Sequence, residues 1–198
     1  MQRPDPLPPA FFPVSLNLVG RRCVVIGDDA EAREKEAALR EVGADVTWLR
    51  DAPSVSEADV RDAFFVISTP KDERLAAWLR EIADRERFLL CAIDQPAFGF
   101  VAMTAIVKCG PARIAISTGG VAPRVGKKLR TALQAALDGT FARFLSCLAT
   151  QRLRNRSRLA TIEERREAMI EAADGFEVEV QVRYPRWFME SEQRNAIL

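Results

Sequence analysis

Residues 24–37, VVIGDDAEAREKEA, decide the fold of this 198-residue chain. The segment opens inside an unbroken apolar run, RRCVVIG, which is typical of a strand buried on both faces of a parallel sheet. From Asp29 onward, Ala and Leu recur on one helical face opposite charged residues, and Gly43 is a suitable end for that helix. The stretch therefore predicts a strand, a sharp turn and a helix, the layout in which many proteins bind a dinucleotide.

The turn between this strand and helix carries carboxylates where the layout normally has glycines. Gly27 is followed by Asp28 and Asp29, and Glu31 stands three residues after Asp28. This spacing predicts a helix start that satisfies its own N–H groups, as a capping box does. A carboxylate ~5 Å from a phosphate charge repels it by roughly 3 kcal/mol at an effective dielectric of ~20. We therefore expect a dinucleotide to bind much more weakly than is usual for the fold.

Strands and helices alternate along the first hundred residues. Further apolar strands are expected at ADVTWL, FFVIST and FLLCAI, with an amphipathic helix, KDERLAAWLREIADRER, before the last of them. This alternation predicts an α/β fold with a Rossmann-like parallel sheet and helices on both faces. Two strands after residue 101, FVAMTAIVKCG and ARIAIST, are joined by a Gly-Pro turn, and we expect them to extend the sheet in antiparallel fashion.

The rest of the chain is helical in pattern from Pro123 onward. Its apolar stripes are wide for so small a bundle, so we expect a second copy of the chain to cover part of them. The tail GFEVEVQVRYPRWF alternates apolar and polar residues, which indicates a strand or an extended arm. We expect a Rossmann-type domain over residues 1–110, a dimerisation region over 111–150 and a small, mainly helical domain over 151–198.

The composition narrows the classes of function. No histidine is present, so any general base must be a carboxylate, lysine, tyrosine or cysteine. The four cysteines are scattered singly in apolar surroundings, which predicts buried thiols and no metal site. A net charge of +1 argues against nucleic-acid binding, and no apolar run approaches the ~20 residues of a membrane span. The proline-rich N-terminus lacks the continuous apolar stretch of a secretory signal, so we expect a cytoplasmic protein.

Residues 95–137 contain no acidic residue, although the chain as a whole is charge-balanced. Ser117, Thr118, Gly119 and Gly120 precede the basic helix of this stretch and add hydroxyl and backbone N–H donors. These features predict a site for a ligand with several carboxylates or phosphates, and the alternative is a solvated basic helix face. The basic residues of the stretch are Lys108, Arg113, Arg124, Lys127, Lys128 and Arg130.

Two acidic residues stand near the ends of expected strands. Asp94 ends a strand at its carboxyl edge, where open α/β sheets bind their ligands, and apolar residues flank it. It is a candidate general base; the alternative is a turn cap, because Asp-Gln-Pro is also typical of turns. Asp51, near the end of the second strand, is placed either to bond a ribose 2′-hydroxyl, which favours NAD over NADP, or to cap the following turn.

Four stretches have the order and spacing of a known family: FFPVSLNLVGRRCVVIG, FFVISTPKDERL, CAIDQPAFGFVAMTAIVKCGPARIAISTGGVAPRVGKKLR and ERREAMIEA. Over about residues 11–175 the chain resembles the precorrin-2 dehydrogenase/sirohydrochlorin ferrochelatase family, the dehydrogenase half of siroheme synthase. The resemblance implies a homodimer with an NAD-binding Rossmann domain, a central dimerisation region and a small helical domain. It also implies oxidation of precorrin-2 to sirohydrochlorin with NAD, and in some members the insertion of ferrous iron.

The resemblance also implies roles for individual residues. Asp94 resembles the family's catalytic aspartate, and Thr118 resembles its small hydroxyl residue near the substrate. The many carboxylates of a tetrapyrrole give the acid-free basic stretch a purpose. The expected substrate site comprises Ser117, Thr118, Gly119, Gly120, Arg124, Lys127 and Lys128. The expected cofactor site comprises Gly27, Asp29, Ala30, Glu31, Asp51 and Thr69.

The chain departs from the family pattern at the glycine turn and at three further places, Cys91, Thr104–Ala105 and Val121–Ala122. We expect an NAD-dependent precorrin-2 dehydrogenase in which Asp94 assists proton removal. Two alternatives stay open. One is a tetrapyrrole-binding chelatase or carrier in which Asp94 handles the metal, and the other is a catalytically silent dimeric homologue that has lost NAD binding.

Overall fold

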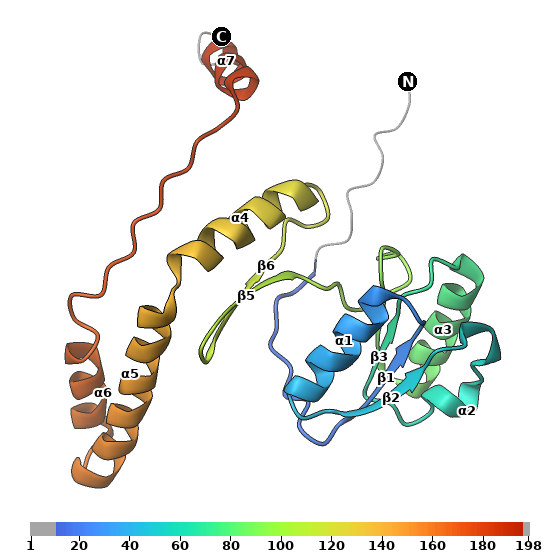
Figure 1. Cartoon of the computed structure of the whole chain (residues 1–198), viewed down its shortest axis with the longest axis horizontal. Helices are drawn as coiled ribbons and strands as arrows, with labels where there is room; N and C mark the ends of the chain where they lie inside the picture. Colours follow the sequence, from blue (N-terminus) through green and yellow to red (C-terminus); the bar gives the residue numbers. More distant parts are fainter. Residues whose placement is uncertain (1–10, 196–198) are drawn as a thin grey trace. The chain divides into compact units, whose positions relative to one another are not determined.

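The computed structural model describes residues 11–195, and Figure 1 shows the course of the chain. The chain divides into two compact units between Asp138 and Gly139. The division into residues 1–110, 111–150 and 151–198 remains a prediction. Residues 1–10 lie outside the described part of the chain. They include most of the proline-rich segment from which we infer that the chain lacks a secretory signal. Within the described part, no helix is long and apolar enough to cross a bilayer.

A four-stranded parallel sheet forms the centre of the first unit (Figure 1). β1, Arg22–Ile26, lies between β2, Asp45–Leu49, and β3, Phe65–Ser68, and β4, Leu89–Ala92, pairs with the far side of β3. The order β2-β1-β3-β4 confirms the predicted Rossmann-like sheet. Because the winding reverses between β1 and β3, the carboxyl ends of these strands flank the crevice where such sheets bind ligands.

Helices cover both faces of this sheet. α1, Ala30–Glu41, packs on the face that includes Val25, and α3, Glu73–Glu86, packs on the opposite face with Val24. Consecutive residues of β1 therefore enter different cores, which is why the strand is apolar throughout rather than alternating. The shorter helical turns of this unit are η1, Ala52–Ser54, and α2, Glu57–Val60.

Gly43 ends α1 as the sequence predicts. Its φ is +81°, its N–H donates to Arg40 O over 2.9 Å, and the N–H of Ala44 donates to Leu39 O over 3.1 Å. These two bonds form a Schellman motif, which satisfies the last carbonyl groups of the helix and needs a residue that tolerates positive φ.

The two strands after residue 101 form a separate hairpin. β5, Ala105–Cys109, and β6, Ala112–Ile116, are antiparallel as predicted, but they make a two-stranded sheet of their own, so the predicted extension of the parallel sheet is wrong. The reason lies at the free edge of β4, where the N–H groups of Phe100 and Val101 both donate to Leu90 O, over 2.8 and 3.0 Å. The chain thus covers this edge before the hairpin begins.

Helix α4, Pro123–Ala136, supports the hairpin from one side. The Gln134 side chain accepts from the N–H of Lys108 and donates to its carbonyl, over 3.2 and 2.9 Å, and so completes the edge of β5 much as another strand would. Arg130 Nε donates to Ile106 O on the same strand over 3.1 Å. These contacts fix the loop between β6 and α4, which carries the expected substrate-binding residues.

The second unit is helical. α5, Gly139–Arg158, packs with α6, Ile162–Glu171, and Phe176 stacks on two phenylalanines of α5 with ring centroids 5.3 and 5.8 Å apart. The sequence pattern of the tail predicts a strand or an extended arm. Residues 176–185 pair with no described strand, and the end of the pattern, Arg-Trp-Phe, instead begins α7, Arg186–Asn195.

Candidate functional site

The site is built on loops that leave the carboxyl edge of the parallel sheet. Gly27 follows β1 with φ +122°, and a Cβ placed there would lie 2.2 Å from Thr69 Oγ1. Thr69 follows β3 and is buried, and its N–H and hydroxyl both donate to Ile26 O, over 3.0 and 3.3 Å. The two loops therefore touch, and only glycine fits at the first position.

Asp29 is the N-cap of α1. Its Oδ1 accepts from the N–H of Ala32 over 2.7 Å, and this hydrogen bond is the main reason that the pKa of Asp29 lies below its ordinary value. The carboxylate is therefore ionised at neutral pH and occupies donors of the first helical turn, where a phosphate otherwise binds. In this chain the Asp29 carboxylate therefore takes the place of a bound phosphate at the start of α1.

The capping box predicted for this turn is wrong in its details. Asp28 precedes the cap, so its carboxylate lies outside the helix, 4.0 Å from Arg50 Nε. Glu31 pairs with Lys35 one helical turn further on, at 3.5 Å, instead of reaching back to the cap. The cap is Asp29 because this residue directly precedes the first helical residue, Ala30, and has the extended backbone that a cap requires.

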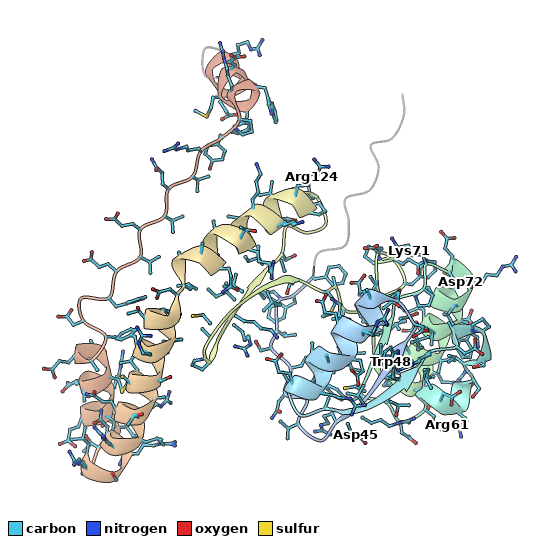
Figure 2. The ribbon with its side chains drawn as sticks, viewed as in Figure 1. Asp45, Trp48, Arg61, Lys71, Asp72 and Arg124 are labelled. Atoms are coloured by element: carbon cyan, nitrogen blue, oxygen red, sulfur yellow. The ribbon has the colours of Figure 1, made fainter. Side chains whose placement is uncertain are left out.

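An aromatic and cationic pair lies at the carboxyl end of β2. Trp48 Nε1 donates to Gly27 O over 2.7 Å, and the Arg50 guanidinium lies 4.1 Å from a Trp48 ring centroid. Figure 2 labels Trp48 in β2. Asp51 follows at the N-cap position of η1, but its side chain makes no cap hydrogen bond. The side chain of Asp51 therefore does not cap this turn. Neither Trp48 nor Arg50 is among the predicted site residues. The available signal was a cation two residues after an aromatic residue at the end of a predicted strand.

Asp94 follows β4 in a left-handed backbone conformation with φ +58°. Its side chain is 63% exposed and Lys71 Nζ lies 2.7 Å from Oδ2. The ion pair raises the pKa of Lys71, chiefly through the hydrogen bond to Asp94. The sequence led us to expect apolar surroundings for this carboxylate, and the structure instead gives it solvent and a cation.

A cavity of about 440 Å³ joins this edge of the sheet to the loop that follows β6. The predicted catalytic residue, Asp94, lies in its wall together with Ser117, Thr118, Gly119 and Gly120. Both glycines have positive φ, and the Ser117 hydroxyl accepts from the N–H of Gly119 over 3.2 Å. The structure thus brings together the candidate base and the expected substrate loop, which the sequence separates by more than twenty residues.

Two further residues of the cavity wall come from the parallel-sheet half of the unit. Cys91 is buried, and burial raises the pKa of its thiol to about 11, so the thiol stays protonated at neutral pH. Glu31, an expected cofactor residue, also lines the cavity. The prediction of buried thiols is confirmed for Cys23, Cys91 and Cys109 and is wrong for Cys147, which is exposed.

The six basic residues of the acid-free stretch differ in their partners. Lys108 and Arg113 both pair with Glu41 of α1, at 2.6 and 3.3 Å. Arg124, Lys127 and Lys128 do not line the cavity, and they make no ion pair within residues 11–195. Figure 2 labels Arg124 at the start of α4. Arg130 also has no acidic partner within the described residues, but its Nε donates to Ile106 O. The charges of Arg124, Lys127 and Lys128 are thus available for an anionic ligand, whereas Glu41, from an element far away in sequence, pairs with both Lys108 and Arg113.

Comparison with known proteins agrees with this architecture. Residues 14–105 match the family described as "Putative NAD(P)-binding". Siroheme synthase of Xylella fastidiosa strain M12 is 30% identical over 178 residues, and that of Nitrosococcus oceani is 26% identical over 174 residues. In both comparisons the match covers 79% of this chain and 37% of the relative, so the chain spans little more than a third of their length.

A solved structure shares the fold. The chain superposes on SirC, a precorrin-2 dehydrogenase, with a TM-score of 0.70 and 20% sequence identity, over 83% of this chain and 90% of that one. The sheet order, the loop after β6 and the sequence matches therefore lead to one assignment. The chain is similar over most of its length to part of siroheme synthase and shares the fold of a precorrin-2 dehydrogenase, in agreement with the family resemblance of its sequence.

Proposed function

We propose that the chain oxidises precorrin-2 to sirohydrochlorin with a nicotinamide cofactor, NAD rather than NADP. The observation that carries this proposal is the cavity that holds both Asp94 and residues 117–120 at the carboxyl edge of the sheet. The names of the relatives, siroheme synthase and precorrin-2 dehydrogenase, support the same reaction.

In this proposal Asp94 accepts the proton that leaves the substrate. Its exposed carboxylate stands in the cavity wall at the end of β4, where loops rather than the sheet determine its position. The Thr118 hydroxyl and the N–H group of Gly120 are suitable donors for a substrate carboxylate. Arg124, Lys127 and Lys128 of α4 attract a polycarboxylate and raise its local concentration near the cavity.

The first turn has the position of a dinucleotide site in such a sheet but opposes a dinucleotide through its charge. Gly27 and Thr69 lie at the switch point between β1 and β3, where their loops touch, and the Asp51 side chain makes no hydrogen bond to η1. Asp29 supplies a negative charge to the same first turn of α1. A dinucleotide bound there accepts the hydride of the reaction, and we propose that its affinity is low.

A second function is favoured by the capped turn itself. If Asp29 excludes the dinucleotide, the chain keeps the substrate cavity and serves as a tetrapyrrole carrier or as a chelatase that takes ferrous iron as a substrate.

We also propose a cytoplasmic homodimer, in which apolar side chains exposed on α4, such as Val125 and Leu129, meet the second copy.

Anaerobic mixing of the purified protein with precorrin-2, with and without NAD, separates these functions. A dehydrogenase converts the precorrin-2 spectrum to that of sirohydrochlorin only when NAD is present. A carrier shifts the precorrin-2 spectrum without conversion and without regard to NAD, and a chelatase consumes added sirohydrochlorin when ferrous iron is supplied. A silent homologue changes neither spectrum, and that result would contradict the proposal.

A further inference from the structure

Lys71 is a charged residue beside the site and is not among the residues predicted from the sequence. It follows β3 by three residues, and its Nζ lies 2.7 Å from Oδ2 of Asp94, which follows the neighbouring strand β4. Figure 2 labels Lys71 beside Asp72, the N-cap of α3. Because β3 and β4 are parallel neighbours, the loops at their carboxyl ends emerge side by side and bring the two side chains together.

The pair is poorly suited to a stabilising role. The Lys71 and Asp94 side chains are 72% and 63% exposed, and exposed pairs of this kind contribute little to folding. Asp94 also adopts a positive φ, which among the described non-glycine residues is shared only with Asp62 and Arg87. Unfavourable backbone conformations that persist in a structure are typical of functional sites.

Lys71 meets the site chiefly at Asp94. Asp94 lines the cavity and Lys71 does not, and Glu31, also in the cavity wall, adds a weaker attraction to the ammonium. Lys71 occupies Oδ2, which leaves Oδ1 as the oxygen that can accept a proton from a ligand. The ammonium partner also limits the rotation of the carboxylate.

From this arrangement we infer that Lys71 is a positioning residue for Asp94, which holds the carboxylate with Oδ1 free to take the proton released from the tetrapyrrole. The inference rests on the proposed dehydrogenase function. Neither Lys71 nor Asp94 belongs to the expected cofactor site, so the inference does not depend on how tightly the nucleotide binds.

The kinetic test is a double-mutant cycle on precorrin-2 oxidation. Lys71→Met should lower kcat about tenfold with little change in the KM for precorrin-2, because a misdirected base slows chemistry more than binding. Lys71→Arg should retain most of the activity, since a cation remains. In an Asp94→Glu background, which keeps a carboxylate but displaces it, Lys71→Met should have a smaller effect on kcat than in the wild type. Arg85→Gln, which breaks an exposed pair with Glu57 on another part of the unit, is the matched control and should leave kcat unchanged.

Additive losses in the cycle, or a rise in KM without a fall in kcat, would overturn the inference, since Lys71 would then act on the substrate directly. A second measurement does not require turnover. Acetylation of Lys71 near neutral pH, followed by mass spectrometry, should be slower than that of Lys127, and Asp94→Asn should accelerate it while Lys127 is unaffected.

These two measurements separate the failures. If the wild-type protein does not oxidise precorrin-2, the proposed function is wrong, and the acetylation rates still decide whether Lys71 holds Asp94. If the wild type oxidises precorrin-2 but the Lys71 variants match it in kcat and acetylation is indifferent to Asp94, the function stands and the inference is wrong.

Discussion

Three residues of the site, Asp94, Gly27 and Asp29, can be tested one at a time. Asp94→Ala should abolish oxidation of precorrin-2 while the protein keeps its fold, because an exposed carboxylate at the end of a strand contributes to chemistry and hardly to packing. Circular dichroism and the thermal midpoint check the fold, and the rate of sirohydrochlorin formation checks the chemistry. Wild-type turnover in this variant would mean that Asp94 is only a turn residue.

Gly27→Ala should damage the first turn severely. The new Cβ would meet Thr69 Oγ1 and the backbone would keep a φ of +122°, so we expect a loss of stability of about 2 kcal/mol or more. Gly175→Ala is a suitable control, because its φ is also positive and no atom lies within 4 Å of its Cβ position. Urea unfolding that gave equal stability for both variants would contradict the close contact between the loops after β1 and β3.

Asp29→Ala should reveal a pH-dependent helix cap. The folded-state pKa of Asp29 is below its unfolded value, so its contribution is complete above the ordinary range of ~4 and is lost as pH falls through the folded value. We expect the variant to lose about 1 kcal/mol at neutral pH and to converge with the wild type in acid. Parallel unfolding curves at neutral and acidic pH measure this, and a constant difference at both would show that the carboxylate does not cap α1.

At the scale of elements, we propose that the β1–α1 turn limits the affinity for the cofactor. We expect Asp28→Gly with Asp29→Gly to tighten NAD binding by at least tenfold, since removing a charge ~5 Å from a phosphate relieves roughly 3 kcal/mol before solvent screening. Glycine at an N-cap costs only a few tenths of a kcal/mol relative to Asp, so the helix should survive. Calorimetry that finds ordinary micromolar affinity in the wild type and no gain in the variant would show that the carboxylates do not oppose the diphosphate.

Helix α4 carries the cations that we expect to attract the substrate. Changing Arg124, Lys127 and Lys128 together to Gln should weaken tetrapyrrole binding and flatten its salt dependence, because exposed charges are screened within ~10 Å at moderate salt. Lys108→Gln with Arg113→Gln is the control, since both of these cations already pair with Glu41. Equal effects of the two variants at low salt would show that the basic residues of α4 form only a solvated helix face and do not bind the substrate.

Elements were predictable from sequence where local pattern determines them. The unbroken apolar strands, the amphipathic α3 and the glycine after α1 each depend on neighbouring residues and were correctly predicted. The separate hairpin was not predictable, because it depends on residues 99–101 covering the edge of β4. The pairing of Glu41 with Lys108 and the pairing of Lys71 with Asp94 depend in the same way on tertiary contacts between distant loops.

At the scale of the whole molecule, we expect a homodimer with most of its contact in residues 105–150. Val121, Val125 and Leu129 are exposed in the single chain, and a second copy would remove their apolar surface from water. Sedimentation at micromolar concentration should give the mass of two chains. A stable monomer under these conditions would rule out the dimer.

We propose that Asp94 acts as the base in the cavity at the carboxyl edge of the sheet while a nicotinamide dinucleotide accepts the hydride in the oxidation of precorrin-2. The most direct measurement follows NADH and sirohydrochlorin together, anaerobically, after purified protein is added to precorrin-2 and a high concentration of NAD. We predict that both products appear in equal amounts with the wild type and that neither appears with Asp94→Ala. Binding of precorrin-2 without NADH formation, or equal rates for the two proteins, would contradict the claim.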